Sequence, residues 1–280
     1  MTDSAKPPSS PLVDRFGEAA RHLENVEGYA KLEKMIARGA CRSFQDRAVD
    51  TNLIQLLCAA ALASPTKSDL QQRDIIVVQD EALKQQIMGL MSEQNWIAGI
   101  PNLLVFCGNN RRQRQVHELR GRAFENDHLD AFFNAAVDAG IALSAFVSAA
   151  ELLGLGCCPI SAIRNKPQQV SDLLNLPQYV FPVAGLAVGY PNFAKPKLSP
   201  RLPLSATVHI DRFADEGIDE TINAYDARRN TITPYAQQRA EEYFGSSETY
   251  GWSEEKARQY ALPERQDFGR FVRSKGFDLS

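Results

Sequence analysis

The stretch Leu129–Leu153, LDAFFNAAVDAGIALSAFVSAAELL, predicts the helix around which the rest of the chain folds. Ala, Ser and Gly dominate its middle, and such small side chains let neighbouring backbones approach closely. A helix with so few polar positions is expected to be buried on nearly all sides. Because Asn134, Asp138 and Glu151 interrupt the apolar run, we expect a core helix of a globular protein and not a membrane span.

Shorter apolar runs on both sides of this stretch predict strands and further helices. The strands are expected over three segments: Ile75–Val78, Asn102–Gly108 and Val180–Pro191. Helical patterns begin at three other positions: Asp50, Glu81 and Pro167. An Asp suits the N-cap of a helix, and a Pro suits the first turn, where its missing N–H costs nothing.

The composition is that of an ordinary soluble protein. At 280 residues the chain can form one large domain or two small ones. Hydrophobic residues make up 44% and charged residues 23%. The net charge of -3 argues against a general nucleic-acid surface. The densest basic run, Asn109–Arg114, is best explained as a solvated loop or a helix start. We therefore expect neither a nucleic-acid nor a membrane partner.

The two ends of the chain and its cysteines suggest a cytoplasmic protein. The first residues, MTDSAKPPSSPL, lack the apolar core of a signal peptide, and their composition predicts a flexible tail over residues 1–12. Residues 211–280 read as surface helices whose aromatic side chains need a partner surface. The cysteines show no C-x-x-C spacing, which is typical of buried free thiols in a reducing compartment; they are Cys41, Cys58, Cys107, Cys157 and Cys158.

Side chains for catalysis or metal binding are not evident. The four histidines lack metal-ligand spacing, and neither a G-x-S-x-G elbow nor a Walker A loop is present. The glycines Gly154 and Gly156 follow a predicted helix, whereas a dinucleotide fingerprint must follow a strand. The sequence therefore predicts no metal site and no catalytic side chain. An enzyme of this kind takes its chemistry from a cofactor.

One pair of cations stands out in RGACRSFQDRAV, from Arg38 to Val49. If the backbone is helical there, Arg38 and Arg42 lie on one face, about one turn apart. An anion such as a phosphate would relieve their mutual repulsion, since Arg binds phosphate through a planar fork of donors. The alternative is two solvated arginines on the surface of an amphipathic helix.

Four segments, taken in order, resemble motifs of the flavin-dependent nitroreductase family. The resemblance is greatest to its branch of NADPH-dependent nitroreductases and flavin reductases. The segments are RGACRSF from Arg38, SPTKSDLQ from Ser64, SAAELLGLGCCPISAI from Ser148 and SPRLP from Ser199. Each motif alone is weak evidence for the family, but four motifs in the family's order are strong evidence.

The resemblance implies an α+β, three-layer fold with a central mixed sheet flanked by helices. It also implies a homodimer with FMN at the interface, in which SPTKSDLQ comes from one subunit and the arginine sites from the other. We expect a single domain over residues 13–280, with a core at about 30–210 and a C-terminal helical extension at 211–280.

By the same resemblance, the protein would be an FMN-dependent oxidoreductase. It would pass hydride from NAD(P)H through the flavin to an electron-poor small molecule such as a nitroaromatic, a quinone or another flavin. The alternative is a flavin-binding scaffold without catalysis, used for sensing or storage.

The resemblance also assigns cofactor contacts to particular residues. The phosphate group would be held by Arg38, Arg42 and Arg201, and the cofactor-binding positions of the same motifs include Gly39, Ala40 and Ser199. The flavin ring would be contacted by Thr66, Lys67, Ser68, Asp69, Gln71 and Gln94. The segment Pro159, Ile160, Ser161 and Ala162 would face flavin N5 with its backbone N–H groups, which Pro159 itself lacks.

Several of these positions differ from the family's motifs. Gly39 and Ala40 replace a basic residue and a Ser, Asp69 replaces an Asn, and Ser199 replaces a Lys. A plain surface Gln is nearly as good an explanation of Gln94. Arg239 lies roughly where the branch binds the 2'-phosphate of NADPH, and a surface arginine explains it at least as well.

Overall fold

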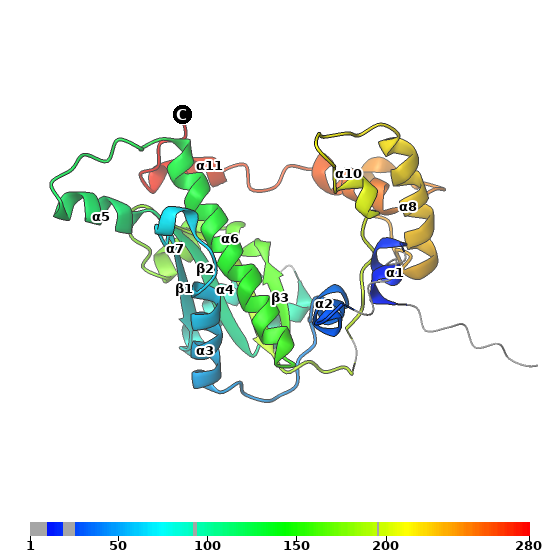
Figure 1. The fold of residues 1–280 in the computed structure, drawn as a ribbon, viewed down its shortest axis with the longest axis horizontal. Coiled ribbons are helices and arrows are strands. Elements are labelled where there is room, and N and C mark those ends of the chain that lie inside the picture. The colour runs from blue at the N-terminus through cyan, green and yellow to red at the C-terminus, as the bar shows by residue number, and fades with distance from the viewer. Residues whose placement is uncertain (1–9, 19–25, 92–93, 195) are drawn as a thin grey trace, which may run out of the picture. The chain divides into compact units, whose positions relative to one another are not determined.

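The computed structural model describes residues 10–18, 26–91, 94–194 and 196–280 (Figure 1). The chain divides into two compact units. The helical unit comprises residues 1–39 and 196–264, and the sheet unit comprises residues 40–195 and 265–280. The single domain expected over residues 13–280 stays a prediction.

The sheet unit contains a four-stranded sheet in the order β1-β2-β4-β3. The strands are β1 (Arg73–Val78), β2 (Asn102–Asn109), β3 (Gly156–Ile160) and β4 (Val180–Gly189). The α+β class is confirmed, but all three strand pairings are antiparallel, so the expected mixed sheet is wrong for the described strands. Val78 pairs with Leu103, so the connection between β1 and β2 leaves and re-enters at the same end of the sheet. Apolar runs in the sequence do not reveal whether neighbouring strands run parallel or antiparallel.

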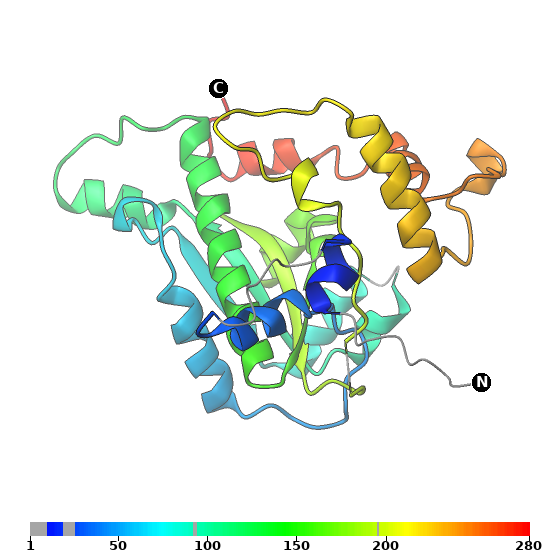
Figure 2. The same ribbon diagram turned by 45° about the vertical axis from the view of Figure 1, so that its right-hand side comes forward.

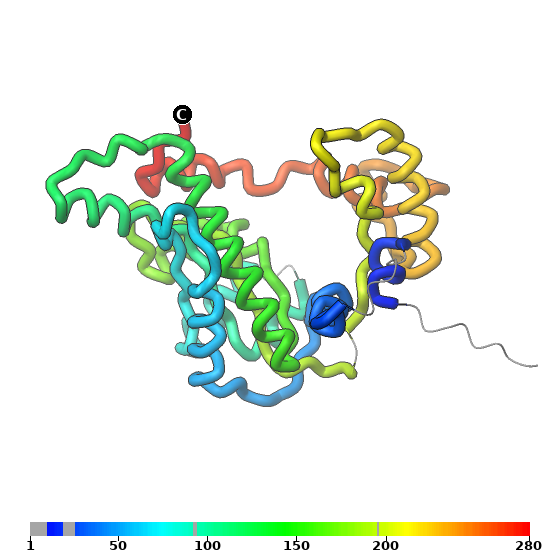
Figure 3. Tube along the Cα trace, viewed as in Figure 1, coloured from blue at the N-terminus to red at the C-terminus, as the bar shows by residue number. Residues whose placement is uncertain are grey.

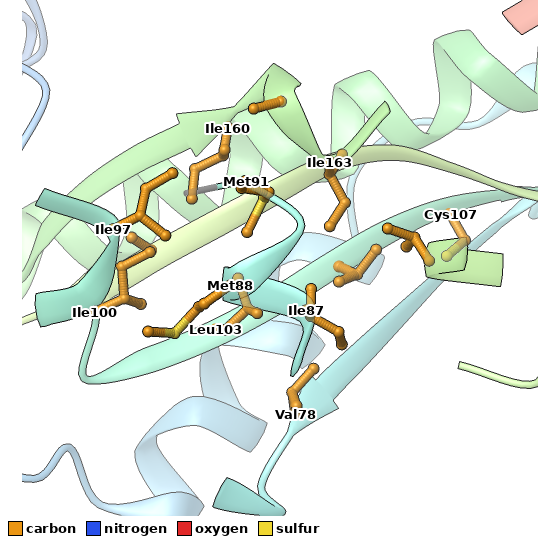
Figure 4. Close-up of a cluster of buried hydrophobic side chains, with 14 of the residues drawn as sticks. Val78, Ile87, Met88, Met91, Ile97, Ile100, Leu103, Cys107, Ile160 and Ile163 are labelled. Atoms are coloured by element: carbon orange, nitrogen blue, oxygen red, sulfur yellow. The ribbon is translucent and has the colours of Figure 1, made fainter. Parts of the chain in front are cut away.

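Alternating side chains of the sheet form two cores, which creates the three layers. On one face, Leu103 and Val105 pack with α4 (Glu81–Gly89) and the 3-10 turn η2 (Asn95–Gly99). Figure 4 shows Leu103 in this cluster together with Ile87, Met88 and Ile97. On the other face, Leu104 and Phe106 pack beneath two long helices. Because successive side chains of a strand point to opposite faces of the sheet, each strand contributes residues to both cores.

The two long helices are α3 (Thr51–Leu62) and α6 (Leu129–Leu152), which lie side by side on that second face (Figure 2). The side chain of Asp50 caps α3 by accepting hydrogen bonds from the amides of Asn52 and Leu53, as the sequence predicted.

The expectation that α6 is buried on nearly all sides is wrong for the single chain. Ala135, Ala139 and Ala142 are fully buried, whereas Phe133 is 59% and Val137 41% exposed. The small residues gather with Phe146 on the face toward the sheet, and the exposed large residues Phe133 and Val137 lie on the face away from it. By length and composition, α6 is the one helix of the described chain that could cross a membrane. Its buried face packs as that of a core helix does.

The helical unit is built from short elements on both sides of the sheet unit in sequence: α1 (Pro11–Phe16), α2 (Tyr29–Ile36), η4 (Leu204–Ala206), α8 (Ile218–Ile232), α9 (Glu241–Phe244) and α10 (Trp252–Ala261). The hydroxyl of Ser10 accepts a hydrogen bond from Val13 N and caps α1, with Pro11 in its first turn. The predicted flexible tail over residues 1–12 falls mostly on residues 1–9, outside the described residues. Pro11 and Leu12 belong to α1.

The segment predicted as one C-terminal extension divides between the two units. Residues 211–264 belong to the helical unit, and α11 (Phe268–Ser274) returns to the sheet unit. There Phe271 and Phe277 pack against Phe181 of β4 and Ala135 of α6. Figure 3 traces the course of the chain from the N-terminus to the red C-terminal segment. The sheet unit also holds α5 (Arg111–Leu119) and α7 (Pro167–Leu173).

Candidate functional site

The segment that carries Arg38 and Arg42 is not helical. Helix α2 ends at Ile36, and the chain continues without regular secondary structure, with Cys41 N donating to the carbonyl of Cys157 (2.9 Å). The prediction that both arginines share a helical face is therefore wrong. Residues 41–45 lie against the sheet instead, and Gly39 packs so closely that a Cβ there would come within 2.6 Å of Lys197 O. Arg38 and Gly39 belong to the helical unit, and Ala40 and Arg42 to the sheet unit.

The helical unit does bring Arg38 together with Arg201. Both line a cavity of about 700 Å³, which we call the arginine cavity. The charged residues that line it, among the described ones, are all arginines: Arg15, Arg38 and Arg201. The rest of its lining is mainly apolar and aromatic: Phe16, Leu32, Met35, Ile36, Pro200, Leu202, Tyr225 and Trp252, with Thr207. Such a cavity favours an anion that also carries apolar surface.

Arg15 is the residue of this cavity that sequence reasoning missed. Its side chain is buried (6% exposed) and donates to three backbone carbonyls. Nε donates to Ile36 O (2.5 Å), one terminal nitrogen to Ser199 O (3.2 Å) and the other to Arg38 O. The Ser10–Pro11 helix start could have drawn attention to α1, but no local pattern indicates these three acceptors.

The loop that carries Ser199 and Arg201 is fixed from several directions. Arg201 N donates to Arg15 O (2.7 Å), and the hydroxyl of Tyr225 donates to Pro200 O (3.0 Å). Arg228 of α8 donates to Arg201 O (2.5 Å) and to Arg15 O (3.2 Å). Burial raises the pKa of the Tyr225 hydroxyl, so it stays a donor at neutral pH. Arg201 is exposed, but these hydrogen bonds hold the backbone that carries it in place.

The sheet unit carries the predicted ring-binding loop, and Asp138 of α6 anchors it. Thr66 Oγ1 donates to Asp138 Oδ2, Lys67 N donates to Oδ1 (3.1 Å) and Gln72 N donates to Oδ2 (3.0 Å). Arg73 lies 3.8 Å from the same carboxylate. Sequence reasoning treated Asp138 only as an interruption of an apolar helix, whereas its carboxylate holds both ends of the loop.

Between these anchors the loop is exposed and unusually bent. Three of its residues have positive φ: Ser68 (48°), Asp69 (56°) and Gln71 (54°). Such backbone costs free energy outside glycine and persists where the surroundings enforce it, often at binding sites. The amide of Gln71 donates to Asp69 Oδ1 (3.2 Å), while Lys67 Nζ lies 4.0 Å from Asp130.

Arg42 and Gln94 meet through an aromatic side chain that sequence reasoning did not select. The Arg42 guanidinium lies over Trp96, 5.8 Å from the ring centroid, and Trp96 Nε1 donates to Gln94 Oε1 (2.8 Å). Both Arg42 and Gln94 are exposed. The structure thus groups two predicted cofactor contacts on one surface of the sheet unit.

The last predicted segment lies where β3 ends and the 3-10 turn η3 (Ser161–Arg164) begins. Ile160 and Ala162 are buried in the core, whereas Pro159 and Ser161 are exposed. The first N–H groups of a helical turn have no partner within it, so the backbone there offers donors to a ligand.

Arg239 is engaged with a neighbouring acid. Its Nε donates to Glu255 Oε1 at 2.8 Å, and the Glu255 side chain is only 8% exposed. This pairing favours a structural role over binding of a nucleotide phosphate.

Comparison with known proteins gives the family. The Nitroreductase family pattern matches residues 35–190, and its C-terminal domain pattern matches residues 199–280. The chain belongs to the nitroreductase family. It is 36% identical over 241 residues to an FMN reductase [NAD(P)H] of Bacillus subtilis, covering 85% of this chain and 94% of the relative. Arg15 and α1 precede the matched residues.

Solved structures agree with this membership. The fold is similar to that of NfrA2 of B. megaterium (TM-score 0.79, 31% identity, 89% of this chain and 98% of the other). It is also similar to an NADPH:FMN oxidoreductase of Vibrio harveyi complexed with NAD+ (TM-score 0.75, 26% identity, 88% and 97%). The α+β fold deduced from four short motifs is thereby confirmed.

Proposed function

We propose that this protein is an FMN-dependent oxidoreductase that takes hydride from NAD(P)H. The electrons pass to an electron-poor small molecule such as a nitroaromatic, a quinone or a free flavin. The observation that carries the proposal is the convergence of Arg38 and Arg201, from sequence motifs far apart, on one cavity. The names of the relatives, which are FMN reductases and NADPH-dependent oxidoreductases, support it.

The residues present fit FMN. Arg38 and Arg201, which line the arginine cavity, provide charge-assisted, bidentate donors for its phosphate. Arg42, which does not line that cavity, is a third candidate. Gln71 and Gln94 carry amides, which can pair with the donor and acceptor edge of a flavin ring. The remaining proposed contacts are Gly39, Ala40, Thr66, Lys67, Ser68, Asp69, Pro159, Ile160, Ser161, Ala162 and Ser199.

When bound, FMN supplies the hydride chemistry, so the chain needs no side chain as an obligatory acid or base. Its own residues bind and orient. The arginines fix the phosphate end, and the bent loop from Thr66 to Gln71 presents backbone and amide groups that Asp138 holds in place. Positioning of this kind is the protein's main contribution to transfer between two bound molecules.

We also propose a cytoplasmic homodimer that shares each FMN between its subunits. The exposed apolar face of α6 carries Phe133 and Val137, and on the neighbouring helix α3 Leu56 is 63% and Leu62 44% exposed. A monomer rarely leaves such a patch open to water, and a two-fold interface would cover it. Sedimentation velocity of the FMN-bound protein tests this proposal, and a stable monomer would refute it.

Titration of apo-protein with FMN at fixed ionic strength tests the phosphate assignment. Arg38→Ala and Arg201→Ala each remove a contact worth about 1.5 to 3 kcal/mol, so FMN should bind about 10- to 100-fold more weakly. Arg212→Ala removes an exposed arginine of the same unit outside the cavity and serves as the control. Affinities within about twofold of the parent for both variants would disprove the assignment.

A second measurement separates the enzyme from a flavin-binding scaffold used for sensing or storage. The flavin absorbance of the holoprotein at about 450 nm should bleach when NAD(P)H is added and return with a quinone. A protein that binds FMN but shows no bleaching would fit the scaffold and not the enzyme.

A further inference from the structure

The N-terminal helix α1 reaches the proposed phosphate site although it lies before the residues that the family pattern matches. The charged residue of α1 that lines this site is Arg15. Its three guanidinium nitrogens each donate a hydrogen bond to a backbone carbonyl, and these carbonyls belong to two separate segments. Ile36 and Arg38 belong to one segment, and Ser199 belongs to the other. Arg15 thus joins the backbones of both proposed phosphate-binding arginines.

The connection is reciprocal. Arg201 N donates to the carbonyl of Arg15 itself, at 2.7 Å. Arg228 of α8 donates to the carbonyls of both Arg15 and Arg201, so α1 and the loop that carries Arg201 are held by the same side chain. Each of these acceptors is a backbone oxygen, so the network fixes the backbone from which the Arg38 and Arg201 side chains extend.

We propose that Arg15 is a positioning residue for the recognition of an organic phosphate by Arg38 and Arg201. This inference rests on the proposed function. Through its hydrogen bonds to three carbonyls, the guanidinium of Arg15 fixes the backbone that carries Arg38 and Arg201. Because this backbone is already ordered, binding of the phosphate costs less conformational entropy. The planar fork is essential, because the single ammonium of a lysine cannot serve three carbonyls in these directions.

Comparison of FMN with riboflavin, which lacks the phosphate, isolates this role. Arg15→Ala and Arg15→Lys should both raise the dissociation constant of FMN about tenfold, and both should leave that of riboflavin within about twofold. The Arg212→Ala control should change neither value. Unchanged riboflavin binding also shows that the variants are folded, since a merely structural role would weaken both ligands together.

The lysine variant distinguishes geometry from charge. If Arg15 acted only as a further positive charge, Arg15→Lys would restore FMN affinity to the parent value, and that result would overturn the inference. Equal weakening of FMN and riboflavin would overturn it as well. In a background that lacks both the Arg38 and the Arg201 side chains, the effect of Arg15→Ala on FMN should shrink to less than about threefold, because coupled residues are not additive. A full tenfold effect there would contradict positioning.

The same titrations tell failure of this inference from failure of the proposed function. If Arg38→Ala and Arg201→Ala bind FMN as the parent does, the phosphate assignment itself is wrong. If those two variants bind FMN weakly while both Arg15 variants bind it normally, the assignment stands and only the role of Arg15 is refuted.

Discussion

Replacement of Asp138 tests whether the ring-binding loop depends on one buried carboxylate. The Asp138 side chain is 1% exposed and that of its partner Arg73 is 3% exposed. Asp138→Ala would leave the Arg73 charge buried without its counter-ion, and would also remove the acceptor of Lys67 N and Gln72 N. Breaking a buried pair on one side costs about 3 to 5 kcal/mol, so we expect a loss of that size in unfolding free energy.

Two variants calibrate this value. Asp138→Asn keeps one oxygen acceptor and loses the charge, so its cost should be smaller, about 1 to 3 kcal/mol. Asp130→Asn changes a carboxylate on the same helix that also faces the loop, but the pair of Asp130 with Lys67 is 51% exposed on both sides. Its cost should be below about 1 kcal/mol, because solvent screens exposed pairs.

Urea unfolding followed by circular dichroism measures these differences, provided that the variants share one m-value. Hydrogen exchange gives the local result: the amides of Lys67 and Gln72 should lose protection in Asp138→Ala and keep it in Asp130→Asn. If Asp138→Ala is no less stable than Asp130→Asn, the carboxylate does not anchor the loop and the reasoning fails.

Three further outcomes are expected. Val137→Asp should turn the proposed dimer into a monomer in sedimentation, since it places a charge on the exposed apolar face of α6. Burial alone would raise the pKa of Glu255, but hydrogen bonds from Tyr250 and Arg239 have the opposite effect, and the net result is a lowered pKa. Glu255→Gln should therefore cost about 1 to 3 kcal/mol at pH 7, and the difference from the parent should vanish as the pH falls through the lowered pKa of that carboxylate. Burial raises the pKa of Cys107 to about 12, so its thiol should resist alkylation at pH 10 until the protein unfolds, as mass spectrometry would detect.

The regular elements with strong local signals could be predicted from the sequence. Helix α6 follows from its apolar composition, α3 from the Asp50 cap, and β1, β2 and β4 from contiguous apolar runs. Strand β3 was missed because GCCPI is short and contains Gly and Pro, which weaken a strand. Its place at the edge of the sheet tolerates Pro159, whose missing N–H is less costly there, and only the strand order determines that place.

The candidate site divides in the same way. The order of four motifs identified the family and the candidate phosphate-binding arginines, because those residue types are chemically required by an anion. The sequence could not show that Arg38 lies beyond the end of a helix. An i, i+4 spacing places two residues on one face only if the backbone is already known to be helical. Nor could it show which face of α6 the large apolar residues occupy relative to the sheet.

The anchors of the site were determined only by tertiary structure. Asp138 reaches Thr66 across 72 positions, and Arg15 reaches Ser199 across 184. Two of the partners of Asp138 are backbone amides, and the three acceptors of Arg15 described above are backbone carbonyls. Every residue has a carbonyl, and every residue except proline has an amide hydrogen, so these partners leave no mark in the sequence. Only the folded chain selects which of them a buried charged side chain will meet.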